Sequence, residues 1–255
     1  MRNWILDLDG VVYRGDKLIP SAREFLLRVR ERGDEVVFFT NNSLHTPEQY
    51  VRKLQNMGIT SSLKDIYTSG ELAAEYLHEQ NIRKVFAIGE KGLKMALRKR
   101  GIKIVEEKEE IEGVVVGLDR RFTYHKLSLA HTAILKGAPF IATNTDSTLP
   151  VEEGILPGAG SIIAAIKEST GKEPLVIGKP HIQGLEIILR ERKWKKEETT
   201  IIGDRWETDI LLGKNSGIRT VLVLTGVTQK KNLSSLPDSQ LPDEIVKSLP
   251  ELLHD

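Results

Sequence analysis

A short apolar run that leads directly into two carboxylates constrains this chain more than any other feature. Trp4–Leu6 is apolar, and Asp7, Leu8, Asp9 and Gly10 follow it. Alternate residues of an extended chain share one face, so Asp7 and Asp9 would place two like charges side by side. Such a pair is costly unless a divalent cation or a proton-transfer task compensates it. The plain alternative is a strand-ending turn, in which Asp and Gly are favoured.

The same spacing of two aspartates occurs in the calcium-binding loop of EF-hands. That loop needs a glutamate at its twelfth position, which in this chain is Leu18. The EF-hand interpretation is therefore excluded.

Three further apolar runs also end in polar side chains. Open α/β sheets bind ligands at the carboxyl ends of their strands. Each polar residue alone has a plain alternative as a loop cap, a solvated lysine or a carboxylate at a helix start. Together they supply what metal-assisted transfer of a phosphoryl group to an aspartate needs. The residues are Thr40 and Asn41 after 36–39, Lys179 after 175–177, and Asp204 with Asp209 after 200–202.

Short apolar runs rich in Val and Ile alternate with stretches of helical period along the chain. This alternation is typical of a parallel sheet with crossover helices, so the predicted fold class is α/β. Pro20 and Pro47 should open two helices, which end at Gly33 and near Gly58. Residues 244–253 are expected to form a short helical tail. The predicted strands are 4–6, 35–40, 84–88, 113–116, 139–142, 175–177, 200–202 and 220–224.

The composition limits which binding partners and which cellular compartment we expect for this protein. The 255 residues carry 37 basic and 36 acidic side chains, and the formal net charge of +1 gives no basic field for nucleic acid. The absence of cysteine excludes disulfides, thiolate metal sites and a cysteine nucleophile. Asp7 interrupts the first apolar run, and no uninterrupted apolar run approaches membrane-spanning length. We therefore expect a cytoplasmic protein without nucleic-acid or membrane partners.

The polar elements stand in the chain as four motifs, in an order that resembles the haloacid dehalogenase superfamily. In detail they are similar to its subgroup of NagD-like and 4-nitrophenylphosphatase-type enzymes, essentially from end to end. Residues 142–146 and 157–161 also look like the cap domain of that subgroup. The four motifs are Asp-Leu-Asp-Gly-Val-Val-Tyr at 7–13, Thr-Asn-Asn-Ser at 40–43, Gly-Lys-Pro at 178–180, and Gly-Asp-Arg at 203–205 with Thr-Asp at 208–209.

This resemblance implies a Rossmann-like, doubly wound parallel sheet as the catalytic core, with an inserted α/β cap. The core would comprise residues 1–79 and 175–255, and the cap residues 80–174. Cap residues would choose the substrate, with Asn144 and Asp146 as candidates. Closure of the cap would exclude water from the nucleophile.

The resemblance also implies hydrolysis through a phosphorylated aspartate. Asp7 would attack phosphorus as the nucleophile, and Asp9 would first protonate the leaving oxygen and then activate water. Mg²⁺ would be bound by Asp7, Asp204 and the main-chain carbonyl of Asp9. Asp209 would orient these ligands without binding the ion itself. Because dehalogenases of the superfamily lack an acid at the position of Asp9, cleavage of carbon–halogen bonds is disfavoured.

Thr40, the Asn41 amide and Lys179 would hold the phosphoryl oxygens by the same resemblance. The implied partner is a small phosphorylated metabolite, and sugar phosphates, nucleotides and aryl phosphates all stay open as substrates of a phosphatase. A homodimer is compatible with the resemblance. Two alternatives also stay open: a phosphotransferase or mutase on the same scaffold, and a non-catalytic sensor of a phosphorylated metabolite.

Overall fold

The chain forms two compact units, each built from several segments of the sequence. The computed structural model describes residues 2–106, 109–151, 154–233 and 236–253. Unit 1 consists of Met1–Thr40, Pro47–Tyr67 and Lys179–Asp255, and unit 2 consists of Asn41–Thr46 and Thr68–Gly178. Among the described residues, every helix is too short or too polar to cross a membrane.

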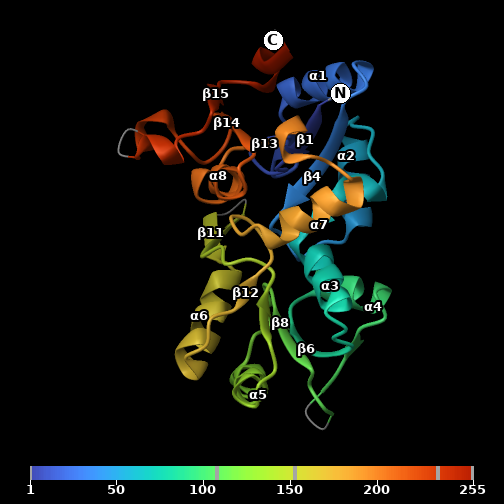
Figure 1. The fold of residues 1–255 in the computed structure, drawn as a ribbon, viewed down its shortest axis with the longest axis vertical. Coiled ribbons are helices and arrows are strands. Elements are labelled where there is room, and N and C mark those ends of the chain that lie inside the picture. The colour runs from blue at the N-terminus through green and yellow to red at the C-terminus, as the bar shows by residue number, and fades with distance from the viewer. Residues whose placement is uncertain (1, 107–108, 152–153, 234–235, 254–255) are drawn as a thin grey trace. The chain divides into compact units, whose positions relative to one another are not determined.

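Unit 1 is organised around a six-stranded sheet in the order β15-β14-β13-β1-β4-β5 (Figure 1). β1 pairs in parallel with β4 on one side and with β13 on the other. The chain therefore leaves β1 toward β4 and later returns to its opposite side, which makes the carboxyl end of β1 a topological switch point. The strands are β1 (Asn3–Leu6), β4 (Glu35–Thr40), β5 (Ile66–Thr68), β13 (Thr199–Gly203), β14 (Arg219–Val223) and β15 (Glu244–Val246).

The helices of unit 1 follow the turn chemistry of the sequence. Pro20 opens α1 and Pro47 opens α2, positions where the missing N–H of proline costs no helical hydrogen bond. Helices, single turns and a hairpin make up the rest of unit 1 around the sheet. They comprise α1 (Pro20–Glu31), α2 (Pro47–Asn56), α7 (Gln183–Arg192), α8 (Leu211–Ser216), the single turns η1 (Leu63–Asp65), η2 (Lys196–Glu198), η3 (Trp206–Ile210), η4 (Lys230–Leu233), η5 (Asp238–Gln240) and η6 (Leu249–Leu253), and the hairpin of β2 (Tyr13–Arg14) and β3 (Lys17–Leu18).

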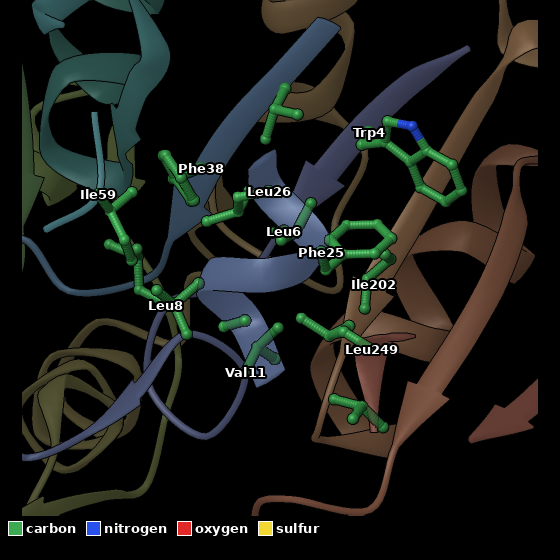
Figure 2. Close-up of a cluster of buried hydrophobic side chains, with 14 of the residues drawn as sticks. Trp4, Leu6, Leu8, Val11, Phe25, Leu26, Phe38, Ile59, Ile202 and Leu249 are labelled. Carbon is green, nitrogen blue, oxygen red and sulfur yellow. The ribbon is translucent and has the colours of Figure 1, made fainter. Parts of the chain in front are cut away.

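A buried apolar cluster joins one face of this sheet to α1 (Figure 2). Trp4 and Phe38 contribute to the cluster from the sheet, and Phe25 and Leu26 contribute from α1. The rings of Trp4 and Phe25 meet edge to face, with centroids 5.3 Å apart. This packing holds the strands that carry the polar motifs in fixed register.

Unit 2 contains a second parallel sheet in the order β12-β9-β8-β6-β7. All of its pairings are parallel. The strands of this sheet are β6 (Lys84–Ile88), β7 (Lys103–Ile104), β8 (Gly113–Val116), β9 (Phe140–Ala142) and β12 (Leu175–Val176). The helices of unit 2 are α3 (Ser69–Glu79), α4 (Lys91–Lys99), α5 (Tyr124–Leu135) and α6 (Ala159–Thr170). A separate antiparallel pair consists of β10 (Thr148–Val151) and β11 (Gly154–Pro157).

The α/β class and the doubly wound parallel sheet confirm the prediction, and β4, β6 and β8 have the predicted bounds. The predicted helical tail at 244–253 is wrong, because its first residues form β15 on the edge of the sheet and only η6 follows. The two compact units have their own bounds, and the division into a core of 1–79 and 175–255 and a cap of 80–174 stays a prediction. Helix α3 packs on α4, and β12 pairs with β9, so both belong to unit 2.

Truncation of Phe25 to alanine should destabilise unit 1 by about 3–5 kcal/mol, because it leaves a cavity beneath Trp4. The free energy of unfolding from urea titration measures this loss. Leu27, on the same helix and 53% exposed, is the matched control, and Leu27→Ala should change stability by no more than about 0.5 kcal/mol. Equal losses in the two variants would contradict the packing described for α1.

Candidate functional site

The carboxyl ends of β1 and β13 bring Asp7 and Asp204 together in unit 1. Asp7 follows β1 directly, and its main-chain N–H donates to the carbonyl of Ile202 on β13 at 2.9 Å. Asp204 follows the last residue of β13. Two neighbouring parallel strands therefore deliver one carboxylate each to the same edge, at the switch point where α/β sheets bind ligands.

Asp209 and Lys179 complete a buried cluster of charges around Asp7. Oxygens of Asp7, Asp204 and Asp209 lie within 4.8 Å of one another. The Lys179 Nζ lies 2.7 Å from Asp7 Oδ1 and 2.6 Å from Asp209 Oδ1. Lys179 is 3% exposed and Asp209 is 1% exposed, so these ion pairs are shielded from water.

The cluster holds more negative than positive charge, and the pKa values of Asp7 and Asp204 are raised in it. Burial raises the pKa of Asp7 to about 7; Lys179 opposes this rise, and the charges of Asp209 and Asp204 add to it. Burial and the charge of Asp209 raise the pKa of Asp204 to about 6. Burial alone would lower the pKa of Lys179, but Asp209 and Asp7 outweigh it and raise that pKa.

This donor set fits a divalent metal ion. Asp7, Asp204 and Asp209 offer hard carboxylate oxygens within reach of one centre, and ions such as Mg²⁺ and Ca²⁺ prefer oxygen ligands. A bound cation would also relieve the repulsion that raises the pKa values of Asp7 and Asp204. The three aspartates could therefore hold a metal ion.

Glycines make room for these carboxylates. A Cβ atom on Gly10 would lie 2.4 Å from Asp204 Oδ2, and one on Gly226 would lie 1.8 Å from the same oxygen. A Cβ on Gly203 would lie 2.1 Å from the Cβ of Asp209. The backbone thus approaches the carboxylates more closely than any side chain would allow.

A loop after β14, residues 224–228, is a part of the site that the sequence analysis missed. The main-chain N–H of Val227 donates to Asp204 Oδ2 at 2.6 Å, and the Thr225 hydroxyl donates to the carbonyl of Gly10 at 2.7 Å. The loop therefore fixes both Asp204 and the turn after Asp9. Its signal was present, because an apolar run at 220–224 is followed by Thr-Gly-Val-Thr.

Asp9 lies outside the buried carboxylate cluster and is exposed to solvent. Loss of part of its hydration raises the pKa of Asp9, and the positive charges of Lys53 and Arg205 oppose that rise. Lys53 is itself held by Asp16 at 3.0 Å and by the Tyr13 ring, whose centroid lies 4.2 Å from its Nζ. A carboxyl group with a raised pKa and access to solvent is suited to proton transfer.

Thr40 ends β4 as a buried residue, and its side chain hydrogen-bonds with that of Tyr50 on α2. The preceding residue, Phe39, lies beneath Lys179, with 5.3 Å between Nζ and the ring centroid. Thr40 and Lys179 thus both belong to unit 1, as do Asp7, Asp9 and the other aspartates of the cluster.

Asn41 belongs to unit 2, where it is bound by the two residues proposed for substrate choice. Asn144 Nδ2 donates to the carbonyl of Asn41 at 2.8 Å, and the hydroxyl of Ser69 donates to the same carbonyl at 2.5 Å. The Asn41 side-chain amide donates to Asp146 Oδ1 at 3.2 Å. Asn144 is buried, Asp146 is half-buried, and both hydrogen-bond to Asn41.

Comparison with known proteins gives matches along nearly the whole chain. The model of the family described as haloacid dehalogenase-like hydrolase matches residues 4–103, and a related model of the same superfamily matches 176–252. A 5'-nucleotidase of Bacillus subtilis is 37% identical over 251 residues, which are 98% of this chain and 96% of the relative. An acid sugar phosphatase of Staphylococcus haemolyticus is 37% identical over 91% of this chain and 88% of its own length. The crystal structure of a 4-nitrophenylphosphatase from Thermotoga maritima is 39% identical, covers 100% of this chain and 97% of its own, and superposes with a TM-score of 0.92.

The substitution Gly226→Ala should weaken divalent-cation binding by about tenfold or more, because the new methyl group overlaps the Asp204 carboxylate. Isothermal titration with Mg²⁺ measures the affinity. Val227→Ala is the matched control, since the Val227 side chain is 57% exposed and its N–H stays in place. Unchanged affinity in Gly226→Ala would show that Asp204 is no ligand.

Cation binding should also strengthen as the pH rises, because Asp7 and Asp204 must lose protons with pKa values of about 7 and about 6. In metal-free protein the raised pKa of Asp7 has the opposite effect: stability falls as the pH rises from its ordinary pKa of 3.8 to about 7. We therefore expect Mg²⁺ to raise the Tm more at about pH 8 than at about pH 5. A shift of the same size at both pH values would contradict the assignment.

Proposed function

Because this chain belongs to the haloacid dehalogenase-like hydrolases, in the NagD-like and 4-nitrophenylphosphatase-type subgroup, and is a phosphoric monoester hydrolase, we propose that it works through a phosphorylated Asp7. The observation that carries the proposal is the buried cluster in which Lys179 joins Asp7 to Asp209 beside Asp204. It combines a nucleophile, a fixed cation and a set of metal ligands at one sheet edge.

In the first step a carboxylate oxygen of Asp7 attacks phosphorus, and the bond from phosphorus to the ester oxygen breaks. Asp9 donates its proton to that leaving oxygen, for which its raised pKa suits it. Lys179, which is fixed by two carboxylates, neutralises charge on the phosphoryl oxygens, and Thr40 with the Asn41 amide hold them in place.

In the second step Asp9, now a carboxylate, takes a proton from water. The water oxygen attacks the phosphorus of the aspartyl-phosphate, and the bond to the Asp7 oxygen breaks. Inorganic phosphate leaves, Asp7 is a carboxylate again, and Asp9 carries the proton needed for the next turnover. Asp9 lies at the solvent-exposed side of the motif, where a water molecule has access to it.

In the proposal Mg²⁺ would be held by the carboxylates of Asp7 and Asp204 and by the main-chain carbonyl of Asp9, and it would neutralise charge on the reacting phosphoryl group. Of the three clustered aspartates, Asp209 would support these ligands without binding the ion, because its carboxylate is paired with the buried Lys179. Without a cation the pKa of Asp7 is about 7, so a share of its carboxyl groups would be protonated and unreactive at neutral pH. Relief of the repulsion from Asp204 and Asp209 therefore also prepares the nucleophile.

We propose small phosphate monoesters as substrates: nucleotides, sugar phosphates or aryl phosphates. Support comes from the relatives, which are named as a 5'-nucleotidase, an acid sugar phosphatase and a 4-nitrophenylphosphatase. In the proposal the inserted residues 80–174 form the cap that selects among these esters. Asn144 and Asp146 would act in it through the position of Asn41, because both hydrogen-bond to that residue and the Asp146 N–H donates to Asn144 Oδ1.

The test is hydrolysis of p-nitrophenyl phosphate by the wild type and by Asp7→Asn, with Mg²⁺ and with EDTA. We expect activity only with Mg²⁺, and a loss of more than about a thousandfold in Asp7→Asn. Asp238→Asn, at an exposed aspartate of η5, is the matched control and should keep full activity. Release of one inorganic phosphate per nitrophenol identifies water as the acceptor, whereas a phosphate deficit would indicate transfer to another acceptor. Activity that survives in Asp7→Asn would overturn the nucleophile.

A further inference from the structure

A cavity of about 480 Å³ opens in unit 1 at the start of β4. Glu35 and Val36, the first residues of β4, line it, and so does the segment 60–65 with η1. Thr40 stands at the other end of the same strand, about 16 Å away at 3.3 Å per residue. The cavity therefore lies at the sheet edge opposite the carboxylate cluster, and the mechanism above makes no use of it.

The carboxylates that line the cavity are already engaged. Arg192 pairs with Glu35 at 3.5 Å and with Asp65 at 3.5 Å. Its remaining donors reach the Tyr67 hydroxyl at 3.1 Å and the carbonyl of Lys64. Asp65 additionally accepts from the Ser62 N–H and hydroxyl. Arg192 and its two acids thus leave this wall of the cavity with one excess negative charge.

Arg30 and Lys64 line the same cavity as cations without a carboxylate partner among the described residues. Arg30 donates to the carbonyl of Thr60 at 2.6 Å and makes no ion pair within the described ranges. Burial lowers the pKa of Arg30, and the charge of Asp65 offsets only part of that effect. Three cations and two carboxylates line the cavity, so its ionisable groups carry a net charge of +1, which an anion would neutralise.

Ser61 supplies a second, independent observation. It is 8% exposed, and its hydroxyl is buried with no hydrogen-bond partner in the described part of the chain. A buried hydroxyl that lacks a partner costs free energy unless a ligand or water satisfies it. Ser61 is also a lining residue of the cavity, and rotation of its side chain would offer the unpartnered hydroxyl to a ligand held by Arg30 and Lys64.

We propose that this cavity is a second binding site, which takes a small anion through a phosphate or carboxylate group held by Arg30, Lys64 and Ser61. Guanidinium, ammonium and hydroxyl donors together match the oxygens of either group. The volume of about 480 Å³ exceeds that of a bare ion and lies in the range of sites for small metabolites.

Isothermal titration of inorganic phosphate into metal-free protein tests the site, with acetate as the carboxylate arm. To keep the catalytic centre out of the measurement, the titrations use the Lys179→Met background. In that background we expect one site for the anion, and Arg30→Met should weaken it by about tenfold or more. Arg28→Met is the matched control, because Arg28 lies on the same helix with its side chain 63% exposed and outside the cavity.

Lys64→Met and Ser61→Ala test the same site with less risk to folding than Arg30→Met. Lys64 is exposed, and Ser61→Ala removes only the unpartnered hydroxyl. Each should weaken the same site while circular dichroism stays unchanged. A preference for phosphate over acetate, or the reverse, identifies the group. Equal affinities in Arg30→Met, Lys64→Met and Arg28→Met, or no anion binding in the background, would overturn the proposal. The function proposed for Asp7 does not depend on either result.

Discussion

The placement of Lys179 between Asp7 and Asp209 is the interaction on which the rest of the site depends. It joins residues 172 positions apart in the chain and fixes the ammonium group between two carboxylates that would otherwise repel each other. One cation cannot balance three buried acids, so burial leaves Asp7 and Asp204 with raised pKa values. The fold maintains this unfavourable charge because parallel strands, a glycine-lined recess and backbone donors hold each group from outside the cluster.

The polar motifs could be located from sequence because a parallel sheet brings the carboxyl ends of its strands to one edge. Asp7 after β1, Thr40 at the end of β4 and Asp204 after β13 follow from that rule alone. The loop at 224–228 follows an apolar run as the other motifs do, but it was missed because it works through a backbone N–H and a glycine, neither of which carries a charge. Residues 244–253 were misread since only the neighbouring β14 decides that Glu244–Val246 extends as an edge strand.

Strand β4 connects two different kinds of polar environment within unit 1. At Thr40 it contributes a buried hydroxyl beside a cluster with excess negative charge, and at Glu35 it borders a cavity with unpaired cations. The apolar residues between these ends are buried against α1 and the neighbouring strands, which keeps the two environments separate. Sequence reasoning found the first because its residues form motifs. It could not find the second, whose members come from α1, η1 and α7 and share no local pattern.

The glycines around Asp204 also decide how long an acidic side chain this position accepts. Methyl groups at Gly10 or Gly226 would overlap the carboxylate, which means that aspartate already fills the recess left by those two backbones. Glutamate at 204 would carry its charge one methylene further and leave the N–H of Val227 behind. Any ion bound at Asp204 would therefore have to fit a carboxylate whose reach these two backbones fix. An engineer who wished to admit a larger cation would therefore begin with the backbone after β14 and leave the aspartate in place.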